Sequence, residues 1–248
     1  MKTIINLSNN FYLKMIDNIN DLPEKIINIE KITFKDFKGE GRVLKIDFNA
    51  LEENKYKKII KRLLFIKNKA VKKKIEMGKR DKEKRLLGYV INYDENNKKH
   101  KEFILGINAV LYNNKYERYN YIYDTVCDYL DSFFYGKNLC DFKDNKCGEK
   151  RNTSSNVGCC HHYKNKILGP LLSNNLIPCE YLKEDHSCGA KCISCKLFTC
   201  DYLEKKGIKF RIRDIFLLDT FFNPLQKYFI KTMVFNPKNK IINRLLKL

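Results

Sequence analysis

The chain has 248 residues, 44% of them hydrophobic, so it can bury a core in one large domain or two small ones. This composition excludes a wholly disordered chain, and no stretch approaches the ~18–20 apolar residues that a membrane-spanning helix needs. The formal net charge is +20, and residues 55–85 concentrate fifteen Lys or Arg against three acidic residues.

The first predicted elements are a hairpin and a long helix. Residues 32–37 and 42–48 carry apolar side chains at alternate positions around the Gly-containing segment 38–41, which predicts two antiparallel strands. Asn49, with a glutamate three residues later, resembles a capping box that opens a helix. This helix is expected to run to about Met77, with an apolar stripe on one face and lysines on the other.

A second pair of strands is predicted next. Residues 86–93 and 102–112 are rich in apolar side chains, and the polar segment 94–97 between them is typical of a turn. The sequence therefore predicts an α+β fold whose N-terminal domain has the order hairpin, helix, hairpin.

Helices dominate the predicted second half outside its cysteine-rich part. Apolar residues at helical spacing predict a helix over 115–135, which Gly136 would end. Beyond residue 200, Asn223-Pro224 and Asn236-Pro237 each pair an N-cap residue with a proline at the first helical position. From the shift in composition we expect an α+β basic domain over 1–136. A cysteine-rich, metal-stabilised region with a helical tail would then occupy 137–248.

The ten cysteines are distributed very unevenly, because all lie between residues 127 and 200 and nine lie from 140 onward. Thiolates are soft ligands that suit zinc and iron–sulfur clusters. The N-terminus lacks the long apolar run of a secretory signal, so we expect a reducing, cytoplasmic location in which clustered cysteines favour metal binding over disulfides. The expected metal ligands are Cys140, Cys147, Cys159, Cys160, Cys179, Cys188, Cys192, Cys195, Cys200 and His161.

Two residues near this set mark its limits. Cys127 is surrounded by apolar positions of the helix over 115–135, so we interpret it as a small core residue. His161 follows the Cys159-Cys160 doublet and could complete a zinc site, whereas the next residue, His162, is expected to be a solvated loop side chain.

The cysteine-rich segment resembles a known family. Gly158-Cys159-Cys160 is followed by Cys179-Glu180-Tyr181-Leu182, then Cys188, then Cys195-Lys196-Leu197-Phe198 and Cys200. Over residues 140–200 this order is similar to the cysteine-cluster proteins of the YkgJ type, zinc- or iron-chelating proteins named for a CxxCxxCC motif. In this chain that motif is replaced by a CX6CX11CC arrangement, and Cys192 is additional. The resemblance implies a bound metal and no particular reaction.

Two other functions stay open from the sequence. One is an iron–sulfur or thiol-dependent enzyme, since residues 188–195 have the CX3CX2C spacing of radical S-adenosylmethionine enzymes and a cysteine–histidine pair can form a nucleophile. The other is a nucleic-acid-binding module with a structural zinc, in which the Lys and Arg residues of 55–85 contact phosphates. AT-rich coding DNA alone produces lysine-rich chains, so we favour a solvated helix there.

Overall fold

The computed structural model describes residues 5–6, 26–34, 43–76, 87–141, 143, 148, 180–181, 183 and 189–248. The chain divides into two compact units, an N-terminal unit of Met1–Asn114 and a C-terminal unit of Lys115–Leu248. The described residues are mostly helical with one small sheet, so the α+β class is confirmed. Among them, no helix is both long and apolar enough to cross a membrane.

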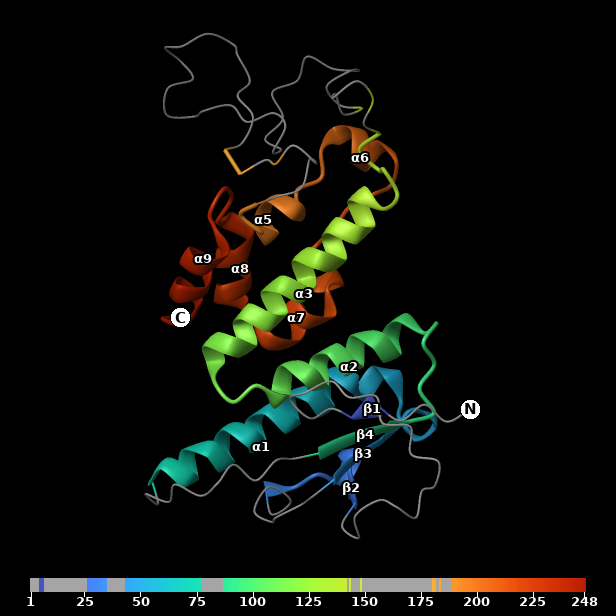
Figure 1. Ribbon diagram of the computed structural model, residues 1–248, viewed down its shortest axis with the longest axis vertical. Helices are drawn as coiled ribbons and strands as arrows, with labels where there is room; N and C mark the ends of the chain where they lie inside the picture. The colour runs from blue at the N-terminus through green and yellow to red at the C-terminus, as the bar shows by residue number, and fades with distance from the viewer. Residues whose placement is uncertain are drawn as a thin grey trace. The chain divides into compact units, whose positions relative to one another are not determined.

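A four-stranded sheet organises the N-terminal unit. Its order is β1 (Ile5–Asn6), β4 (Leu87–Ile91), β3 (Val43–Asp47) and β2 (Ile26–Asn28), as Figure 1 shows. β3 runs parallel to both β2 and β4, whereas β1 pairs antiparallel with β4. The two strands at the centre are the longest, and Leu44 and Ile46 of β3 are fully buried.

The predicted first hairpin is wrong in its pairing. The strand expected over 42–48 is confirmed as β3, but its described neighbours run parallel to it. Ile32 and Thr33 lie outside any strand, after the 3-10 helix η2 (Ile29–Lys31), while residues 35–42 lie outside the described part. Parallel strands need a crossover rather than a tight turn, and the crossover from β3 to β4 contains the long helix α1.

The helix α1 (Tyr56–Glu76) is confirmed, although it begins later than expected. The side chain of Asp47 accepts a hydrogen bond from the Asn49 backbone N–H and caps a 3-10 turn, η4 (Phe48–Ala50). A second such turn, η5 (Glu53–Lys55), leads into α1. The inner face of α1 is apolar and buried, and it consists of Tyr56, Ile59, Ile60, Leu63 and Ile66.

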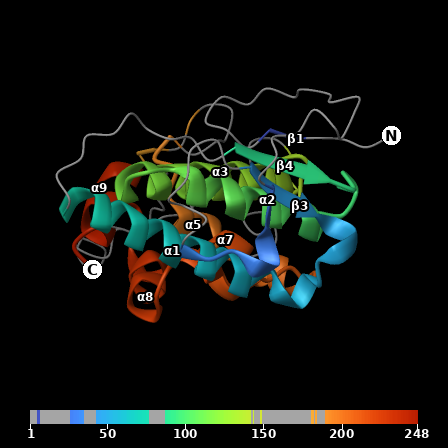
Figure 2. The same cartoon turned by 90° about the horizontal axis from the view of Figure 1, so that it is seen from below.

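The second predicted hairpin is also wrong, because residues 102–112 do not form a strand. They belong to α2 (Lys98–Leu111), and the supposed turn ends in Asn97, whose side chain accepts the backbone N–H groups of Lys99 and His100. α2 packs against α1, and the two helices run alongside each other (Figure 2). Phe103 of α2 stacks on Tyr56 at 4.4 Å between ring centroids.

The C-terminal unit is a helical assembly around α3 (Lys115–Tyr135), which is confirmed at its predicted bounds. The further elements are α5 (Ile193–Lys196), α6 (Asp201–Lys205), η6 (Ile212–Asp214), α7 (Phe216–Phe221), α8 (Pro224–Thr232) and α9 (Lys238–Leu245). α3 packs against α5, α7 and α9, and α8 packs against α5 and α9 (Figure 1).

Two predicted boundaries change in this unit. The units separate at 114/115, whereas composition placed the domain boundary at 136/137, because α3 packs with α5, α7 and α9 rather than ending the first domain. The predicted N-cap of α8 is confirmed, since the Asn223 side chain accepts the Gln226 backbone N–H at 2.8 Å; the Asn223 backbone N–H in turn donates to the Gln226 side chain, which completes a capping box. α9 is preceded by Pro237 as its N-cap, one residue later than predicted.

Candidate functional site

The structure places four of the ten predicted ligands, all in the C-terminal unit. Cys192 and Cys195 lie at and within α5, Cys200 precedes α6, and Cys140 follows α3. The other six lie outside the described residues, namely Cys147, Cys159, Cys160, Cys179, Cys188 and His161. Cys127 is fully buried on α3, so its predicted core position is confirmed.

Cys192 and Cys195 form the central feature of the site. α5 is a single helical turn, and Cys192 is its N-cap residue, with an extended backbone that turns into the helix. Because three residues make nearly one helical turn, both side chains point to the same side of α5. The side chains of the two cysteines are hydrogen-bonded to each other. Cys192 is only 1% exposed, whereas Cys195 is half-buried.

The loop after α8 supplies polar groups to both sulfurs. The Phe235 backbone N–H donates a hydrogen bond to Cys195 Sγ at 3.2 Å, and Cys192 Sγ donates to the Met233 carbonyl at 3.4 Å. Between them, the Ser194 hydroxyl donates to the Lys231 carbonyl at 2.6 Å. These bonds hold α5 against the end of α8 and the loop that follows it.

Two backbone positions beside the sulfurs have an unusual conformation. Lys191, directly before Cys192, has a φ of 48°, and Phe235 has a φ of 57°. Neither residue is glycine, so each left-handed conformation costs free energy that the surrounding contacts must offset. Strain of this kind is concentrated at functional sites, and here it directs the Phe235 N–H towards Cys195.

The thiol of Cys192 is acidic. The hydrogen bond with Cys195 lowers its pKa to about 6 from 9.0, against the opposing effect of burial. The backbone N–H groups of Cys195, Asn236 and Phe235 lower the pKa further, because they stabilise the negative charge of the thiolate. The site is thus arranged to hold a thiolate, which is the form of cysteine that binds metals.

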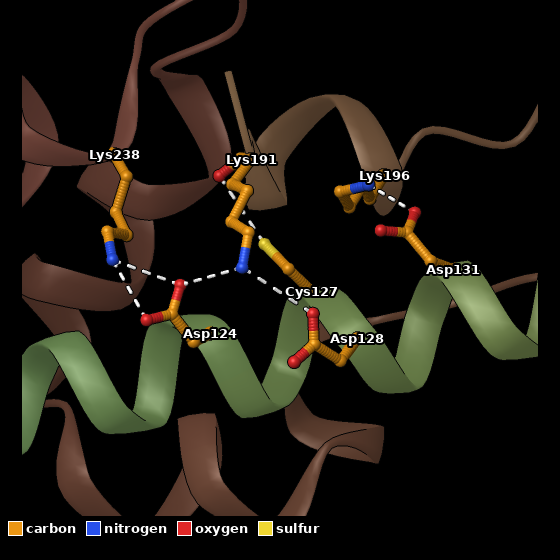
Figure 3. Close-up of polar contacts among 7 residues, drawn as sticks. All are labelled: Asp124, Cys127, Asp128, Asp131, Lys191, Lys196 and Lys238. Atoms are coloured by element: carbon orange, nitrogen blue, oxygen red, sulfur yellow. Dashed lines mark hydrogen bonds and ion pairs between the residues drawn. The ribbon is translucent and has the colours of Figure 1, made fainter. Parts of the chain in front are cut away.

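An acidic stripe on α3 fixes the segment around α5. Asp124 binds Lys238 at 2.9 Å and Lys191 at 3.2 Å, and Asp128 lies 3.6 Å from Lys191 (Figure 3). Burial would raise the pKa of Asp124, but the hydrogen bonds from Lys238 and Lys191 outweigh burial and leave that pKa lowered. The Asp124 carboxylate therefore binds both Lys191, which precedes Cys192, and Lys238, the first residue of α9.

A second carboxylate of the same stripe binds α5 itself. Asp131 pairs with Lys196, whose side chain is only 7% exposed (Figure 3). Asp124, Asp128 and Asp131 are spaced at helical intervals on one face of α3, and this spacing is already visible in the sequence.

Two buried side chains of α3 lie under the Cys192–Cys195 turn. The Ile193 backbone N–H donates to the Tyr123 hydroxyl at 3.1 Å, and burial raises the pKa of Tyr123 so that this hydroxyl stays neutral. The Cys127 thiol donates to the Lys191 carbonyl at 3.4 Å (Figure 3). Cys127 therefore supports the strained backbone at Lys191.

The segments that carry Cys140 and Cys200 are joined at a second place in the unit. The Tyr202 hydroxyl donates to the Asp141 carboxylate at 3.2 Å, which joins the residue after Cys140 to the segment after Cys200. The Gly148 backbone N–H donates to the Cys140 carbonyl at 2.8 Å, and Gly148 lies close to the Tyr202 ring. A Cβ at Gly148 would approach that ring to 2.4 Å, so any other residue there would require the ring to move.

These contacts define pairs of sulfurs rather than a complete metal site. Within the described ranges, no three His, Cys, Asp or Glu side chains converge closely enough to hold an ion. Comparison of the chain with protein-family models, curated proteins and solved structures found no match. The resemblance of residues 140–200 to the YkgJ type stays a prediction from its motifs.

Proposed function

We propose that the C-terminal unit binds zinc or an iron–sulfur cluster through cysteine thiolates, with Cys192 and Cys195 as two of the ligands. The observation that carries this proposal is the geometry of the two sulfurs. They lie on one side of a single helical turn, hydrogen-bonded to each other, and a backbone N–H is directed at Cys195. Two ligands a few residues apart in a tight turn are how proteins start a tetrahedral thiolate site, and a second pair from elsewhere completes it.

The remaining ligands would come from cysteines outside the described residues. The Gly189 backbone N–H donates to the Tyr181 carbonyl at 2.8 Å, which closes the chain between two positions that neighbour Cys179 and Cys188 in the sequence. The corresponding bond from Gly148 to Cys140 closes the segment that contains Cys147. Cys140, Cys147 and Cys200 are candidates for a second centre, so we expect one or two metal equivalents per chain.

The proposed role of the metal is structural. Residues 137–200 are rich in Gly, Asn, Asp and Lys and have little periodic apolar pattern, a composition typical of a segment that cannot fold without a further source of stability. Metal binding can supply the missing folding free energy, as it does in small zinc-binding domains. Reduced thiols are needed for this chemistry, which fits the cytoplasmic location expected from the sequence.

A thiol-dependent enzyme is the second candidate, because a thiolate with a lowered pKa is also a nucleophile. In this site, however, the acidic sulfur belongs to Cys192, which is 1% exposed. A substrate cannot reach a buried sulfur, whereas a metal ion held between Cys192 and Cys195 can be coordinated by it. Burial of the acidic Cys192 thiol therefore favours a bound metal over covalent catalysis.

The test is metal analysis of the full chain after purification without oxygen or chelator. We expect stoichiometric zinc in a colourless protein or iron with sulfide in a brown one. Cys192→Ser and Cys195→Ser should each lose metal, because each leaves an ion short of one ligand. Cys127→Ser is the matched control, since Cys127 is also buried and contacts the same segment but is not a proposed ligand.

Two outcomes would contradict the proposal. One is a folded, unaltered chain that holds almost no metal under these conditions. The other is full metal content in Cys195→Ser together with loss in Cys127→Ser, which would reverse the assignment of the two cysteines.

A further inference from the structure

The outer face of α1 is strongly basic, and it belongs to the N-terminal unit, whereas the proposed metal centre belongs to the C-terminal unit. Lys58, Arg62, Phe65, Lys69 and Lys72 are spaced by three or four residues, so they form one stripe along the helix, and Lys61 flanks it. All six side chains are exposed. From Lys58 to Lys72 the stripe spans about 21 Å, at ~1.5 Å per residue. We call these six residues the basic face of α1.

The basic face contains no acidic residue. α1 carries nine Lys or Arg and a single carboxylate, Glu76, at its last position. Within the part of the chain that the structure describes, no carboxylate forms an ion pair with Lys58, Lys61, Arg62, Lys69 or Lys72.

Several lysines of the C-terminal unit do have acidic partners. Lys191, Lys196, Lys209, Lys227 and Lys238 each lie within 4.0 Å of an Asp or Glu. A general bias towards lysine adds cations without regard to their neighbours, so it does not explain a face from which acids are missing.

The apolar face of α1 is already buried inside the protein. Ile60 and Leu63 are fully buried, and Ile59 and Ile66 are nearly so, in the core of the N-terminal unit. A helix that binds a lipid surface must insert a broad apolar face between the acyl chains. The basic face offers only Phe65 for that purpose. Its partner is therefore a polyanion bound by charge rather than a lipid surface bound by apolar insertion.

Phe65 is the unusual member of this face, because it is 67% exposed in the middle of a stripe of cations. Arg62 and Lys69 lie one turn before and one turn after it. Unpaired nucleic-acid strands are bound by this combination, in which cations contact phosphates and an aromatic ring stacks on a base. We propose that the basic face of α1 binds single-stranded nucleic acid.

The experiment measures binding of the full chain to a fluorescent single-stranded RNA, the matching single-stranded DNA and the duplex. Five phosphate contacts predict a log–log slope of about −3.5, which is roughly a 100-fold loss of affinity between ~50 and ~200 mM salt. Lys58→Gln, Lys61→Gln, Arg62→Gln and Lys69→Gln combined should weaken binding and reduce that loss to about threefold. Phe65→Leu should weaken single-strand binding at least about fivefold and leave the slope unchanged.

The matched control neutralises four exposed lysines of the C-terminal unit, Lys205, Lys231, Lys240 and Lys247, and should leave binding nearly unchanged. Circular dichroism checks that each variant is folded. Absence of salt-sensitive binding, or equal weakening by the control variant, overturns the proposal. Tighter binding to the duplex than to the single strands, together with no effect of Phe65→Leu, also overturns the proposal. So does binding to phosphatidylserine vesicles without binding to the single-stranded RNA or DNA.

Discussion

Removing the carboxylate of Asp131 should loosen α5 more than removing any exposed charge nearby. Lys196 is 7% exposed and Asp131 31% exposed, so Asp131→Asn leaves an ammonium group almost buried beside a neutral partner. Breaking a fully buried pair costs ~3–5 kcal/mol, and partial exposure of Asp131 lowers our expectation to about 2 kcal/mol. Hydrogen exchange at the Leu197 amide, which bonds to the Ile193 carbonyl at 2.9 Å, should then become roughly 30-fold faster.

Two further variants serve as controls for this prediction. Asp128→Asn removes a carboxylate that is 68% exposed and 3.6 Å from Lys191, so Leu197 exchange should change less than about twofold. The double variant Asp131→Asn/Lys196→Met also removes the unpaired ammonium charge, so it should recover at least half of the lost free energy of opening α5. The reasoning is refuted if Asp128→Asn and Asp131→Asn act equally, or if the double variant exchanges faster than Asp131→Asn alone.

Three further predictions concern single side chains. The pKa of Cys192 is lowered to about 6 in the folded chain, so the metal-free protein should become more stable as pH rises from about 6 towards 9.0. This stabilisation should be lost as pH falls through about 6. Ultraviolet absorbance of the thiolate follows the titration, and Cys192→Ser should abolish the pH dependence. The Tyr56 hydroxyl is buried with no hydrogen-bond partner among the described residues, so in urea unfolding Tyr56→Phe should leave stability unchanged or raise it by up to about 1 kcal/mol. Asn223→Ala removes the cap of α8 and should cost about 1 kcal/mol in the same assay; an unchanged midpoint would show that the capping box is not needed.

Elements whose two faces differ were predictable from the sequence. α1 and α3 each have a buried stripe and a polar face, and both were found at nearly the right place. α2 was mistaken for a strand because almost every residue from 103 to 110 is buried, and a helix buried on all sides shows no 3.6-residue period. The flanking Asn97 was the usable signal, since its side chain caps the helix rather than forming a hairpin turn.

Strand direction was beyond the local pattern. Alternating apolar residues identified β3, but alternation is the same in parallel and antiparallel strands. The order along the chain held the missing information, because a long amphipathic helix between two strands is typical of a parallel crossover. We instead paired each strand with its nearest neighbour in sequence.

At the candidate site, the sequence included Cys192 and Cys195 among the ten expected ligands but did not single them out as a pair, and Cys192 was regarded as additional to the family pattern. The sequence also did not predict which of the two is buried, or that the backbone of Phe235 reaches Cys195, since these facts depend on a loop 40 residues away. The acidic stripe of α3 was present in the sequence, but its partners Lys191 and Lys238 are far from it in sequence, and only the packed unit brings them together.

The distribution of charge gives the two units opposite responses to ionic strength. In α1, cations three and four residues apart repel one another, so the helix depends on burial of its inner face, and screening ions should stabilise the N-terminal unit. In the C-terminal unit, the partly exposed pairs of Asp124 attract, so the same ions should weaken them. Salt therefore changes the relative stability of the two units, and low ionic strength should be the condition under which the N-terminal unit opens first.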